Sequence, residues 1–473
     1  MLDGSFLGLA QLLRWMIVAE HELLLFAAFF FIVSAVDEAA VDFAWLWLRL
    51  NGHSGTGVLP SGLTDAPLLG HAAILVPAWH EDAVIGAMIA HTLGAWRQRD
   101  FTLYIGCYRN DPKTLAAAVA GASGDTRVRI VVNGIDGPTT KADCLNRLYA
   151  ALRADEIRNG RPFRNIILHD AEDMVHPAAL AVMDRALAEV EFVQLPVRPE
   201  PQPRSLWIAG HYSDEFTESH AKTLVVRDAL GAAIPAAGVG CGFARRALAD
   251  LARLRMAAGG AGPFAAECLT EDYELGLLIA RNGGRSRFLR LRDADGRLVA
   301  TRSYFPASLD AAVRQKARWI HGIAFQGWER LGWNGRPVEI WMTLRDRRGP
   351  LTAVVLAAAY LLLLVEGLLG VARLAGWHEA PEPSALLRFM IALSFVSLLW
   401  RMVFRFAFTA REYGVTEGVL SLFRIPIANI IAIMAGRRAL VSYMGTLRGG
   451  AVRWDKTVHG FHPATRDVRE AAA

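Results

Sequence analysis

Asn165-Ile-Ile-Leu-His-Asp-Ala-Glu-Asp173 is the strongest local signal in the sequence. It opens with a short apolar run typical of a buried strand, and three carboxylates follow at Asp170, Glu172 and Asp173. Ligands of open α/β sheets collect at the carboxyl ends of strands. Crowded carboxylates repel one another unless a cation lies among them, and Mg²⁺ or Mn²⁺ held by one or two of them keeps positions for diphosphate oxygens. The stretch predicts a metal site, with a solvated acidic turn before a helix near Pro177 as the alternative.

The residues around this stretch alternate short β-rich runs with helical stretches, from about residue 71 to residue 305. This pattern is typical of an α/β domain with a largely parallel sheet. Strands are expected at residues 72–76, 103–106, 128–132, 165–168 and 192–195. Helices are expected at residues 81–96, 141–158 and 177–189. We assign the domain to residues 70–345.

Both ends of the chain are more apolar than one soluble domain requires: 53% of the 473 residues are hydrophobic, and the mean hydropathy is +0.26. Within an N-terminal region of residues 1–50, an amphipathic segment at 6–19 precedes an expected membrane span at 23–48. Within residues 350–440, two further spans are expected at 351–374 and 385–400. No removable signal peptide is expected, because an early basic region and a small-residue cleavage site are missing.

Residues 418–436 form a less regular apolar run, because Arg424, Pro426 and Asn429 interrupt it and basic residues follow it. We expect an interfacial or re-entrant helix here, with a full span as the alternative. Arginines follow the first and third expected spans. Basic residues favour the cytoplasmic side, so the middle domain and the basic tail at 441–473 are expected in the cytosol of a multi-pass membrane protein.

Three carboxylates, Asp37, Glu38 and Asp42, lie in the first apolar helix. Ionisable residues in a membrane helix are functional candidates, and these could line a path for an exported glycan. Pairing with Arg401 or Arg405 at the cytoplasmic interface is the interpretation that we favour.

Charge and cysteine content exclude two classes of function. The net charge is +5, but Lys/Arg runs interleaved with aromatic residues are missing, so nucleic acid is not an expected partner. The four cysteines lie in the middle region without a C-x-x-C pair, which indicates reduced, partly buried thiols instead of a zinc or redox motif.

A second acidic cluster, Thr270-Glu271-Asp272, opens a helical pattern. An aspartate near a sugar donor can act as the general base that takes the proton of an acceptor hydroxyl. The alternative is an N-cap followed by favourable first-turn charges, which has the same composition.

A third cluster, Arg314-Gln-Lys-Ala-Arg-Trp319, precedes the C-terminal apolar region. Arg314 and Arg318 are four residues apart and share a helix face, and their planar guanidinium groups suit phosphate. Trp319 offers a flat surface that can cover a sugar ring. The alternative is a basic juxtamembrane helix that touches lipid headgroups.

In this order the clusters resemble the motifs of processive family 2 glycosyltransferases, including cellulose and hyaluronan synthases. The likeness rests on Val-Pro-Ala-Trp-His-Glu at 76–81, Asp-Ala-Glu-Asp at 170–173, Thr-Glu-Asp at 270–272 and Gln-Lys-Ala-Arg-Trp at 315–319. A narrower likeness, to membrane glycosyltransferases of the bacteriophage adsorption protein B type, rests on residues 169–177, 314–323 and Trp-Asp-Lys-Thr-Val-His at 454–459.

The resemblance implies a GT-A-like, Rossmann-type domain inserted between transmembrane helices, and it implies roles for single residues. The implied donor-binding residues are Pro77, Glu81, Asp111, Lys141, Asp170, Gln315 and Arg318. For Lys141, a solvated lysine at a helix start is the alternative. The nucleoside position departs from the family pattern, because Asn110-Asp111-Pro112 stands where a paired aspartate is usual.

The same resemblance implies Asp272 as the base, with Glu271 beside it, and a Mg²⁺ or Mn²⁺ ion at Asp170. The second metal position reads Glu172, so Glu172 and Asp173 compete for that role. The implied acceptor-binding residues are Trp319, Gly240, Cys241 and Gly242. Without the resemblance, the glycine cluster at 238–242 predicts a tight turn before a helix at 245–254, and it lacks the spacing of a dinucleotide site.

The implied activity is inverting transfer of a hexose or N-acetylhexosamine from a UDP-sugar to a growing cell-envelope or exopolysaccharide chain. The implied partners are a nucleotide-sugar donor, a glycan or lipid-linked acceptor, membrane lipids and an envelope export partner. Single-sugar transfer to a polyprenyl phosphate is one alternative. A non-catalytic membrane scaffold or phage-receptor component is another.

Overall fold

A seven-stranded sheet forms the centre of the middle domain, in the order β4-β3-β2-β5-β8-β6-β9. The computed structural model describes residues 3–53, 55–333, 335–377, 382–450 and 460–465. The strands are β2 (Ala72–Pro77), β3 (Phe101–Tyr108), β4 (Val128–Asn133), β5 (Asn165–Leu168), β6 (Phe192–Gln194), β8 (Cys241–Ala244) and β9 (Ser286–Phe288). The five expected strands are all present, within two residues of the expected bounds at each end.

The sheet is mixed. Strands β4, β3, β2 and β5 run parallel to one another, whereas β8 runs antiparallel to both β5 and β6. The sequence predicted only a turn before the helix where β8 lies. The strand was missed because Cys241-Gly-Phe-Ala244 contains no β-branched residue, and β-propensity depends on packing context.

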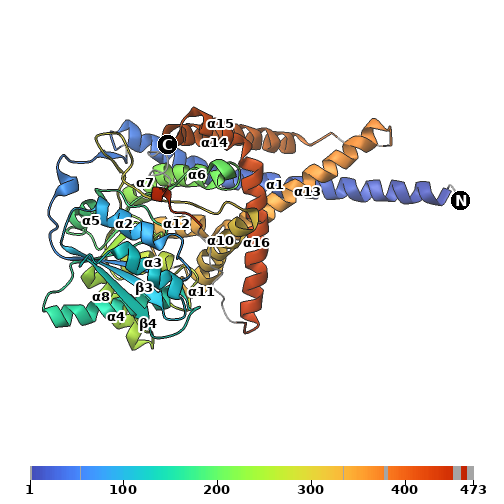
Figure 1. Cartoon of the computed structure of the whole chain (residues 1–473). Coiled ribbons are helices and arrows are strands. Elements are labelled where there is room, and N and C mark those ends of the chain that lie inside the picture. Colours follow the sequence, from blue (N-terminus) through green and yellow to red (C-terminus); the bar gives the residue numbers. More distant parts are fainter. Residues whose placement is uncertain (1–2, 54, 334, 378–381, 451–459, 466–473) are drawn as a thin grey trace.

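Helices cover both faces of the sheet (Figure 1). They are α2 (Ile85–Ala95), α3 (Pro112–Ala122), α4 (Lys141–Asn159), α5 (Ala179–Ala186), α8 (Arg245–Ala257) and α9 (Glu271–Arg281). Successive strand residues point to opposite faces. Ile74 of β2 therefore packs in one core with residues of α2 and α5, and Leu75 packs in the other core with residues of α4, α8 and α9.

Shorter elements join this domain to the long apolar helices. The strands are β1 (Gly57–Val58), β7 (Val197–Pro199), β10 (Leu291–Arg292) and β11 (Thr301–Ser303). The helices are η1 (Leu63–Asp65), η2 (Pro203–Ser205), α6 (Gly210–Glu218), the π-helix η3 (Ser219–Thr223), α7 (Leu224–Ala229), α10 (Leu309–Ile320), the π-helix η4 (His321–Gln326), α11 (Gly327–Leu331) and α12 (Pro337–Arg347).

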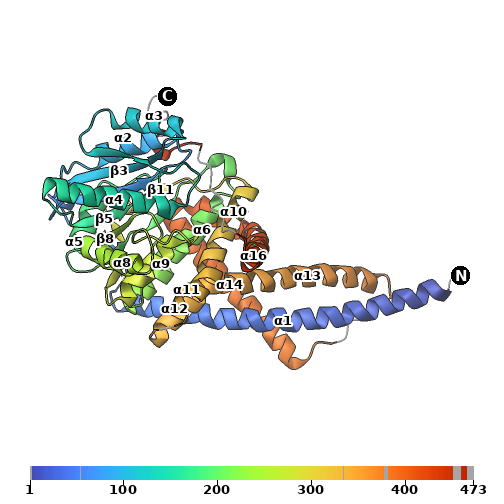
Figure 2. The ribbon, with the colours of Figure 1, turned by 90° about the horizontal axis from the view of Figure 1, so that it is seen from below.

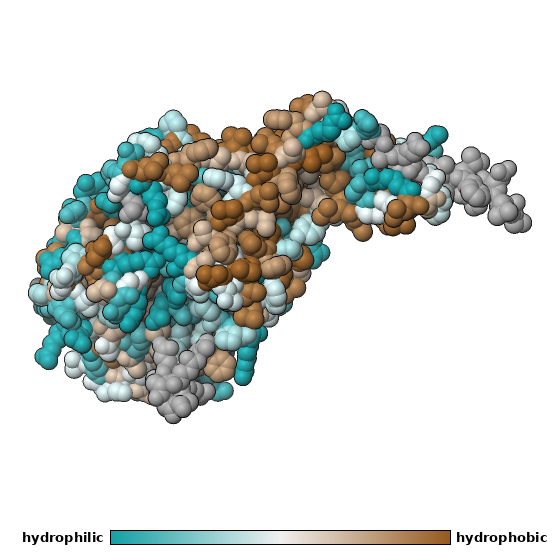
Figure 3. All heavy atoms as spheres, turned by 90° about the horizontal axis from the view of Figure 1, so that it is seen from above, coloured by the Kyte–Doolittle hydropathy of each residue, from teal (hydrophilic) through white to brown (hydrophobic). Residues whose placement is uncertain are grey.

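Four helices in the described part of the chain are long and apolar enough to cross a membrane. They are α1 (Asp3–Leu50), α13 (Gly349–Leu374), α14 (Ala385–Tyr413) and α16 (Ile425–Leu447). The amphipathic segment and the span expected before residue 50 form one continuous helix, α1. Figure 3 shows a broad hydrophobic surface between the middle domain and the far end of the apolar helices.

Helix α16 differs in direction from α1 and α13. The chain turns between α15 (Val415–Phe423) and α16 at Arg424, which is followed by Pro426. Figure 1 shows α16 running across the direction of α1 and α13, and Figure 2 shows α16 nearly end-on beside α13. Helix α16 packs against α10 and α13. By length it suffices for a span, but its direction is that of a helix lying along the membrane surface if α1 and α13 cross it.

The three carboxylates of α1 are paired, as we favoured, but with other partners than expected. Asp37 accepts hydrogen bonds from Arg345 and Arg348, and Glu38 contacts the same two arginines. Their partners come from the end of α12, which returns the chain to lie beside α1.

Asp42 of α1 is held by the Lys222 ammonium of η3, with the Nζ and Oδ1 atoms 2.6 Å apart. Arg405, an expected partner, instead contacts Asp214 of α6 at 3.2 Å.

Helix α14 contributes as well: the Trp400 indole Nε1–H donates to Asp42 Oδ2 at 2.9 Å, and Arg401 lies close enough to Glu38 to interact with it electrostatically. The expected pairing between apolar helices is therefore present in part, but the direct ion pairs of the three carboxylates are with Arg345, Arg348 and Lys222.

Candidate functional site

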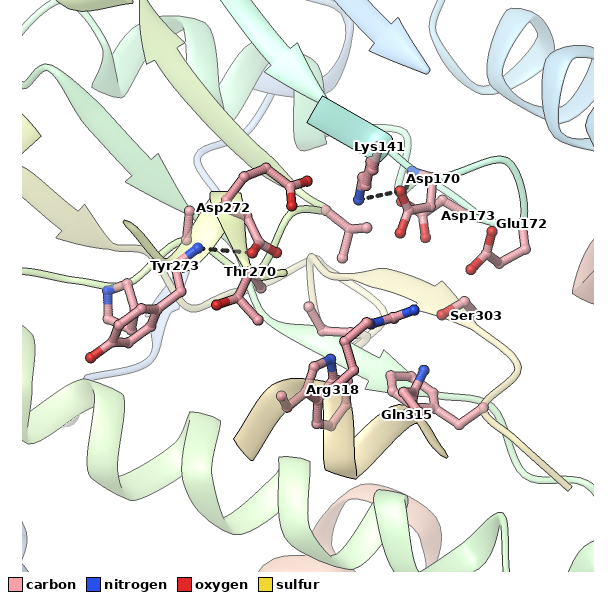
Figure 4. A pocket seen from close by; sticks show the side chains of 18 of the residues that line it. Lys141, Asp170, Glu172, Asp173, Thr270, Asp272, Tyr273, Ser303, Gln315 and Arg318 are labelled. Atoms are coloured by element: carbon pink, nitrogen blue, oxygen red, sulfur yellow. Dashed lines mark hydrogen bonds and ion pairs between the residues drawn. The ribbon is translucent and has the colours of Figure 1, made fainter. Parts of the chain in front are cut away.

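A cavity of about 390 Å³ lies at the carboxyl ends of β2 and β5, and side chains from all three acidic and basic motifs line it (Figure 4). Of the residues proposed from the sequence, those in its lining are Pro77, Glu81, Lys141, Asp170, Glu172, Asp173, Glu271, Asp272, Gln315, Arg318 and Trp319. The clusters lie about 100 and 45 residues apart in the chain, so the fold is what brings them together.

Lys141 lies between the two acidic clusters. It is the first residue of α4, where a capping box formed by Thr140 and Asp143 fixes the helix start. Its Nζ atom is 2.5 Å from Asp170 Oδ1. Burial alone would lower the pKa of Lys141, but the carboxylates of Asp170 and the 271–272 pair outweigh it and raise the pKa. The ammonium is therefore charged at neutral pH, because the nearby carboxylates stabilise its charge in place of water.

Asp173 shapes the loop that carries the other two carboxylates. Its side chain is buried, and its Oδ2 atom lies 3.0 Å from the Asp170 amide nitrogen and 2.8 Å from His169 Nδ1. Burial raises the pKa of Asp173. The Asp173 carboxylate is thus used in hydrogen bonds within the loop. Asp170 and Glu172 are therefore the better candidates to bind a ligand.

The donor set of this loop fits a divalent cation that shares its coordination with a ligand. Among the described residues, groups of three or more His, Cys, Asp or Glu side chains arranged to hold a metal are absent. Mg²⁺ is commonly held by only one or two carboxylates together with substrate phosphates and water. Asp170 and Glu172 supply that smaller number.

The Thr270-Glu271-Asp272 cluster opens α9, but Thr270 makes no capping hydrogen bond with its side chain. Thr270 instead packs against Gly322 of η4, where a Cβ atom would lie 2.3 Å from its hydroxyl oxygen. Asp272 Oδ1 accepts a hydrogen bond from the Tyr273 amide at 2.8 Å. Burial raises the pKa of Asp272, and burial together with Asp272 raises the pKa of Glu271 to about 8.

Helix α10 carries the basic cluster, and it starts at the N-cap Ser308, whose hydroxyl accepts from the Ala311 amide. Gln315, Arg318 and Trp319 line the cavity, whereas Arg314 pairs with Asp310 on the same helix and is not in the lining. The Gln315 side-chain oxygen is buried without a hydrogen-bond partner among the described residues. A buried polar atom of this kind calls for a ligand or water.

Of the donor-binding residues expected after β2 and β3, Pro77 and Glu81 line the cavity, but Asp111 does not. Asp111 is the N-cap of α3, and its carboxylate accepts hydrogen bonds from the amides of His80 at 2.7 Å and Thr114 at 3.3 Å. It therefore supports the turn before Glu81 from behind.

The glycine cluster assigned to the acceptor does not reach the cavity. Gly240 faces Thr301, Cys241 is buried in the core, and Gly242 faces Met183 and Leu187 of α5. These three residues belong to or adjoin β8, and the sheet and α5 occupy the space around them. Ala236, Ala237 and Val239 line the cavity instead.

Gly238 is the glycine of this cluster that the site requires. Its φ is +76°, and a Cβ atom there would lie 2.4 Å from Asp272 Oδ2 and 3.2 Å from Lys141 Nζ. The sequence showed the glycine but not its neighbours, which are contributed by α9 and α4.

Other lining residues were missed by sequence reasoning. Trp79 and Tyr108 line the cavity beside Pro77, with their ring centroids 4.9 Å apart. Further lining residues are Phe216, Ser219, Thr223, Tyr304 and Phe305. Trp79 stood within a quoted motif, but the π-helix η3 has no sequence signal that could have identified Ser219 and Thr223.

Residues 70–322 match the family model described as glycosyltransferase like family 2. The chain is 34% identical over 419 residues to bacteriophage adsorption protein B of Escherichia coli strain K12, and equally to bacteriophage N4 adsorption protein B of Escherichia coli O157:H7. These alignments cover 84% of this chain but 56% of each relative, so the chain spans little more than half their length.

Among solved structures, the chain is similar to the mannosyltransferase PcManGT of Pyrobaculum calidifontis, determined with GDP-Man and Mn²⁺. The TM-score is 0.50 at 15% identity, and the match covers 88% of this chain and 99% of that one. At this identity the likeness concerns the fold, which is GT-A-like, with apolar helices attached.

Proposed function

The chain belongs to glycosyltransferase like family 2, and from that premise we propose that it extends a cell-envelope glycan with sugars from a UDP-hexose or UDP-N-acetylhexosamine donor. It acts at the cytosolic face of a bacterial inner membrane. The observation that carries the proposal is the single cavity in which the Asp-Ala-Glu-Asp, Thr-Glu-Asp and Gln-x-x-Arg-Trp motifs meet. A scaffold or receptor component would have no need of this convergence.

The donor occupies the half of the cavity between β2, the loop after β5 and α10. Asp170 and Glu172 hold Mg²⁺ or Mn²⁺, which would neutralise charge on the diphosphate leaving group. Lys141 and Arg318 supply further positive charge to the diphosphate. Pro77 and Glu81 border the nucleoside.

Asp272 acts as the general base. It takes the proton of the acceptor hydroxyl while that oxygen bonds to the anomeric carbon, and the bond from that carbon to the diphosphate breaks with its electron pair on the diphosphate. Inversion at the anomeric carbon follows from this single displacement. Glu271 suits the role less, because burial and the neighbouring Asp272 charge raise its pKa and favour its protonated form.

The acceptor occupies the half of the cavity beside α6 and η3. Trp319, Phe305 and Phe216 offer aromatic faces to sugar rings, and Ser219 and Thr223 offer hydroxyls. The ring centroids of Phe216 and Phe305 are 4.9 Å apart, and those of Phe216 and Trp319 are 6.3 Å apart.

Charge at the acceptor end favours a neutral glycan over a polyprenyl phosphate. Arg227 is a positively charged residue that lines this end of the cavity, and its guanidinium group already forms an ion pair with Asp346 at 2.8 Å. His220, which also lines this end, is neutral because burial lowers its pKa to about 4. A phosphate placed here would lack an unpaired positive partner among these described residues. Sizing of radiolabelled product tests the choice, since a polyprenyl phosphate acceptor would give a lipid carrying one sugar.

The proposed mechanism assigns different roles to α9, which carries the base, and to α10, which binds diphosphate and acceptor. Substitutions in each helix test these roles. In Asp272→Asn, we expect kcat to fall by roughly 10²- to 10⁴-fold, the range for loss of a general base, while UDP and Mn²⁺ still bind. In Arg318→Ala, we expect weaker UDP binding, because a charge-assisted contact to phosphate is lost in ground and transition states alike. In Trp319→Ala, UDP should stay bound and use of the acceptor should fail.

Calorimetric titration of each purified full-length variant with UDP and Mn²⁺ measures these differences. Arg314→Ala is the matched control, because Arg314 lies on the same helix outside the cavity lining. If Asp272→Asn lost UDP affinity while Arg318→Ala kept it, the two roles would be wrongly assigned.

A further inference from the structure

The last described segment of the chain, residues 460–465, lies against the catalytic domain beside the loop that carries Asp170 and Glu172. In Figure 2 this short red segment lies with the sheet and α2, on the far side of α10 from α16. We call it the C-terminal segment. Its His462 side chain is fully buried, whereas the preceding Phe461 is 70% exposed.

Hydrogen bonds fix the tautomer of His462. Its Nδ1 atom lies 3.1 Å from the amide nitrogen of Ala464, which can only donate. Nδ1 is therefore the acceptor, and the ring proton is on Nε2. That Nε2–H group donates to the backbone carbonyl of Asp173, 3.0 Å away and 289 residues earlier in the chain.

Asp173 is the residue through which this contact reaches the metal loop. Its carboxylate accepts from the Asp170 amide, and its own amide donates to the Asp170 carbonyl at 3.2 Å, so the backbone of Asp170 is held by Asp173. Glu172 directly precedes it. A hydrogen bond to the Asp173 carbonyl thus acts on both proposed metal ligands without touching either.

Contacts from other elements also hold the three residues that follow Asp173. Met174 exchanges two backbone hydrogen bonds with Arg302, at 2.7 and 3.0 Å. The rings of His91 and Trp96 contact the carbonyls of Val175 at 3.0 Å and His176 at 3.1 Å. His462 extends this support by one residue, to the end of the metal loop itself.

We infer that His462 is a positioning residue for divalent-metal binding, and that the C-terminal segment completes the donor site from outside it. The inference rests on the proposed function, because it takes Asp170 and Glu172 as the metal ligands. Outer partners of metal ligands orient them and tune affinity for the ion. A neutral hydrogen bond acting through the backbone should change that affinity by about 5-fold.

The test compares His462→Ala, His462→Gln and Phe461→Ala in the full-length protein. The glutamine amide can replace the Nε2–H donor, and Phe461→Ala changes an exposed side chain of the same segment. Each variant is titrated with Mn²⁺ in the presence of UDP, and free Mn²⁺ is measured by electron paramagnetic resonance. This gives the metal affinity without any turnover. We expect about 5-fold weaker Mn²⁺ binding in His462→Ala, recovery in His462→Gln, and no change in Phe461→Ala.

Hydrogen exchange of the amides at 170–174 is measured on the same variants without metal. Faster exchange there in His462→Ala, with a melting temperature near that of the wild type, is expected from local loosening of the loop. Unchanged exchange and unchanged Mn²⁺ affinity would overturn the inference. Equal losses in His462→Ala and His462→Gln would also overturn it, because packing and not the hydrogen bond would then be responsible. Failure of wild-type protein to bind Mn²⁺ with UDP would instead contradict the proposed function.

Discussion

Lys141 offsets part of the negative charge of the two acidic clusters in the cavity. The Asp170 carboxylate lies 2.5 Å from its ammonium, and the Glu271 and Asp272 carboxylates also raise its pKa. Lys141 therefore faces two acidic clusters that would otherwise repel each other, and Arg318 of α10 lines the same cavity. A divalent cation brought by a nucleotide sugar would add the positive charge that this balance lacks.

Replacement of Asp170 separates catalysis from stability. We expect Asp170→Asn to abolish Mn²⁺-dependent transfer, because a ligand of the metal is lost. The melting temperature should change little, because the loss of the ion pair with Lys141 is offset by relief of repulsion among the remaining carboxylates. Activity assays and thermal melts check both statements. Asp65→Asn, at a surface pair in which the Asp65 side chain is 59% exposed, is the control. Retained turnover, or full wild-type activity in EDTA, would refute the metal assignment.

Gly238 is required by geometry. Gly238→Ala places a Cβ atom 2.4 Å from Asp272 Oδ2, so we expect transfer to fall at least tenfold as the base is displaced. Gly124→Ala is matched to it, because Gly124 has φ +78° with open space around it. Both variants should lose roughly 1 kcal/mol of stability from the left-handed backbone. Activity assays at equal folded fraction make the comparison, and equal activity of the two variants would contradict the position of Asp272.

At the scale of elements, α10 joins the cavity to the membrane region. One face of α10 carries Gln315, Arg318 and Trp319 toward the cavity, and Ala317 packs with Ala435 and Ala439 of α16. These small side chains let the two helices lie close together. The position of α16 therefore bears directly on the acceptor end of the site.

Cysteine labelling decides whether α16 lies along the membrane. If it does, a cysteine at Arg448 stays on the cytosolic side, whereas a cysteine at Pro383 between α13 and α14 is outside. We expect a membrane-impermeant maleimide to label Pro383→Cys in intact cells and to label Arg448→Cys only after lysis. The unmodified protein is the background control, since its four thiols are buried and burial raises the pKa of Cys107 and Cys268 to about 12. Labelling of Arg448→Cys in intact cells would make α16 a true span.

Across the whole molecule, a buried cluster of charges joins α1 to the catalytic domain. Lys222 of η3 is 2% exposed and contacts Asp42 at 2.6 Å, Glu218 at 2.7 Å and Glu38 at 3.8 Å. Since η3 also lines the acceptor end of the cavity, the first apolar helix is coupled to the site through this lysine.

Removal of that lysine should separate the two parts. Lys222→Met leaves buried carboxylates without their partner, which typically costs about 3–5 kcal/mol. We expect a clear drop in the melting temperature of the detergent-solubilised protein and faster proteolysis between α1 and β2. Lys113→Met, at an exposed position of α3, should melt like the wild type. Equal melting of the two variants would mean that the cluster does not hold α1 to the domain.

The sequence by itself determined the elements that local patterns specify. The strand Asn165–Leu168 and the start of α4 at Lys141 are where the apolar run and the helix pattern predicted them. The family was also recognisable, because its motifs are short runs of adjacent residues in a set order. Neither inference needs contacts between distant parts of the chain.

Tertiary structure alone decided which residues meet. The insertion of β8 between β5 and β6, the place of Gly238 beside Asp272, and the pairing of Asp42 with Lys222 join segments distant in the chain. The same holds for His462 and Asp173. Such contacts form only when whole elements pack against one another. The free energy gained by burying apolar surface between elements is larger than local conformational preferences. The spacing of residues in the sequence does not reveal these contacts. The partners of the α1 carboxylates, the absence of Gly240 and Gly242 from the cavity lining and the contact of the C-terminal segment therefore could not be predicted.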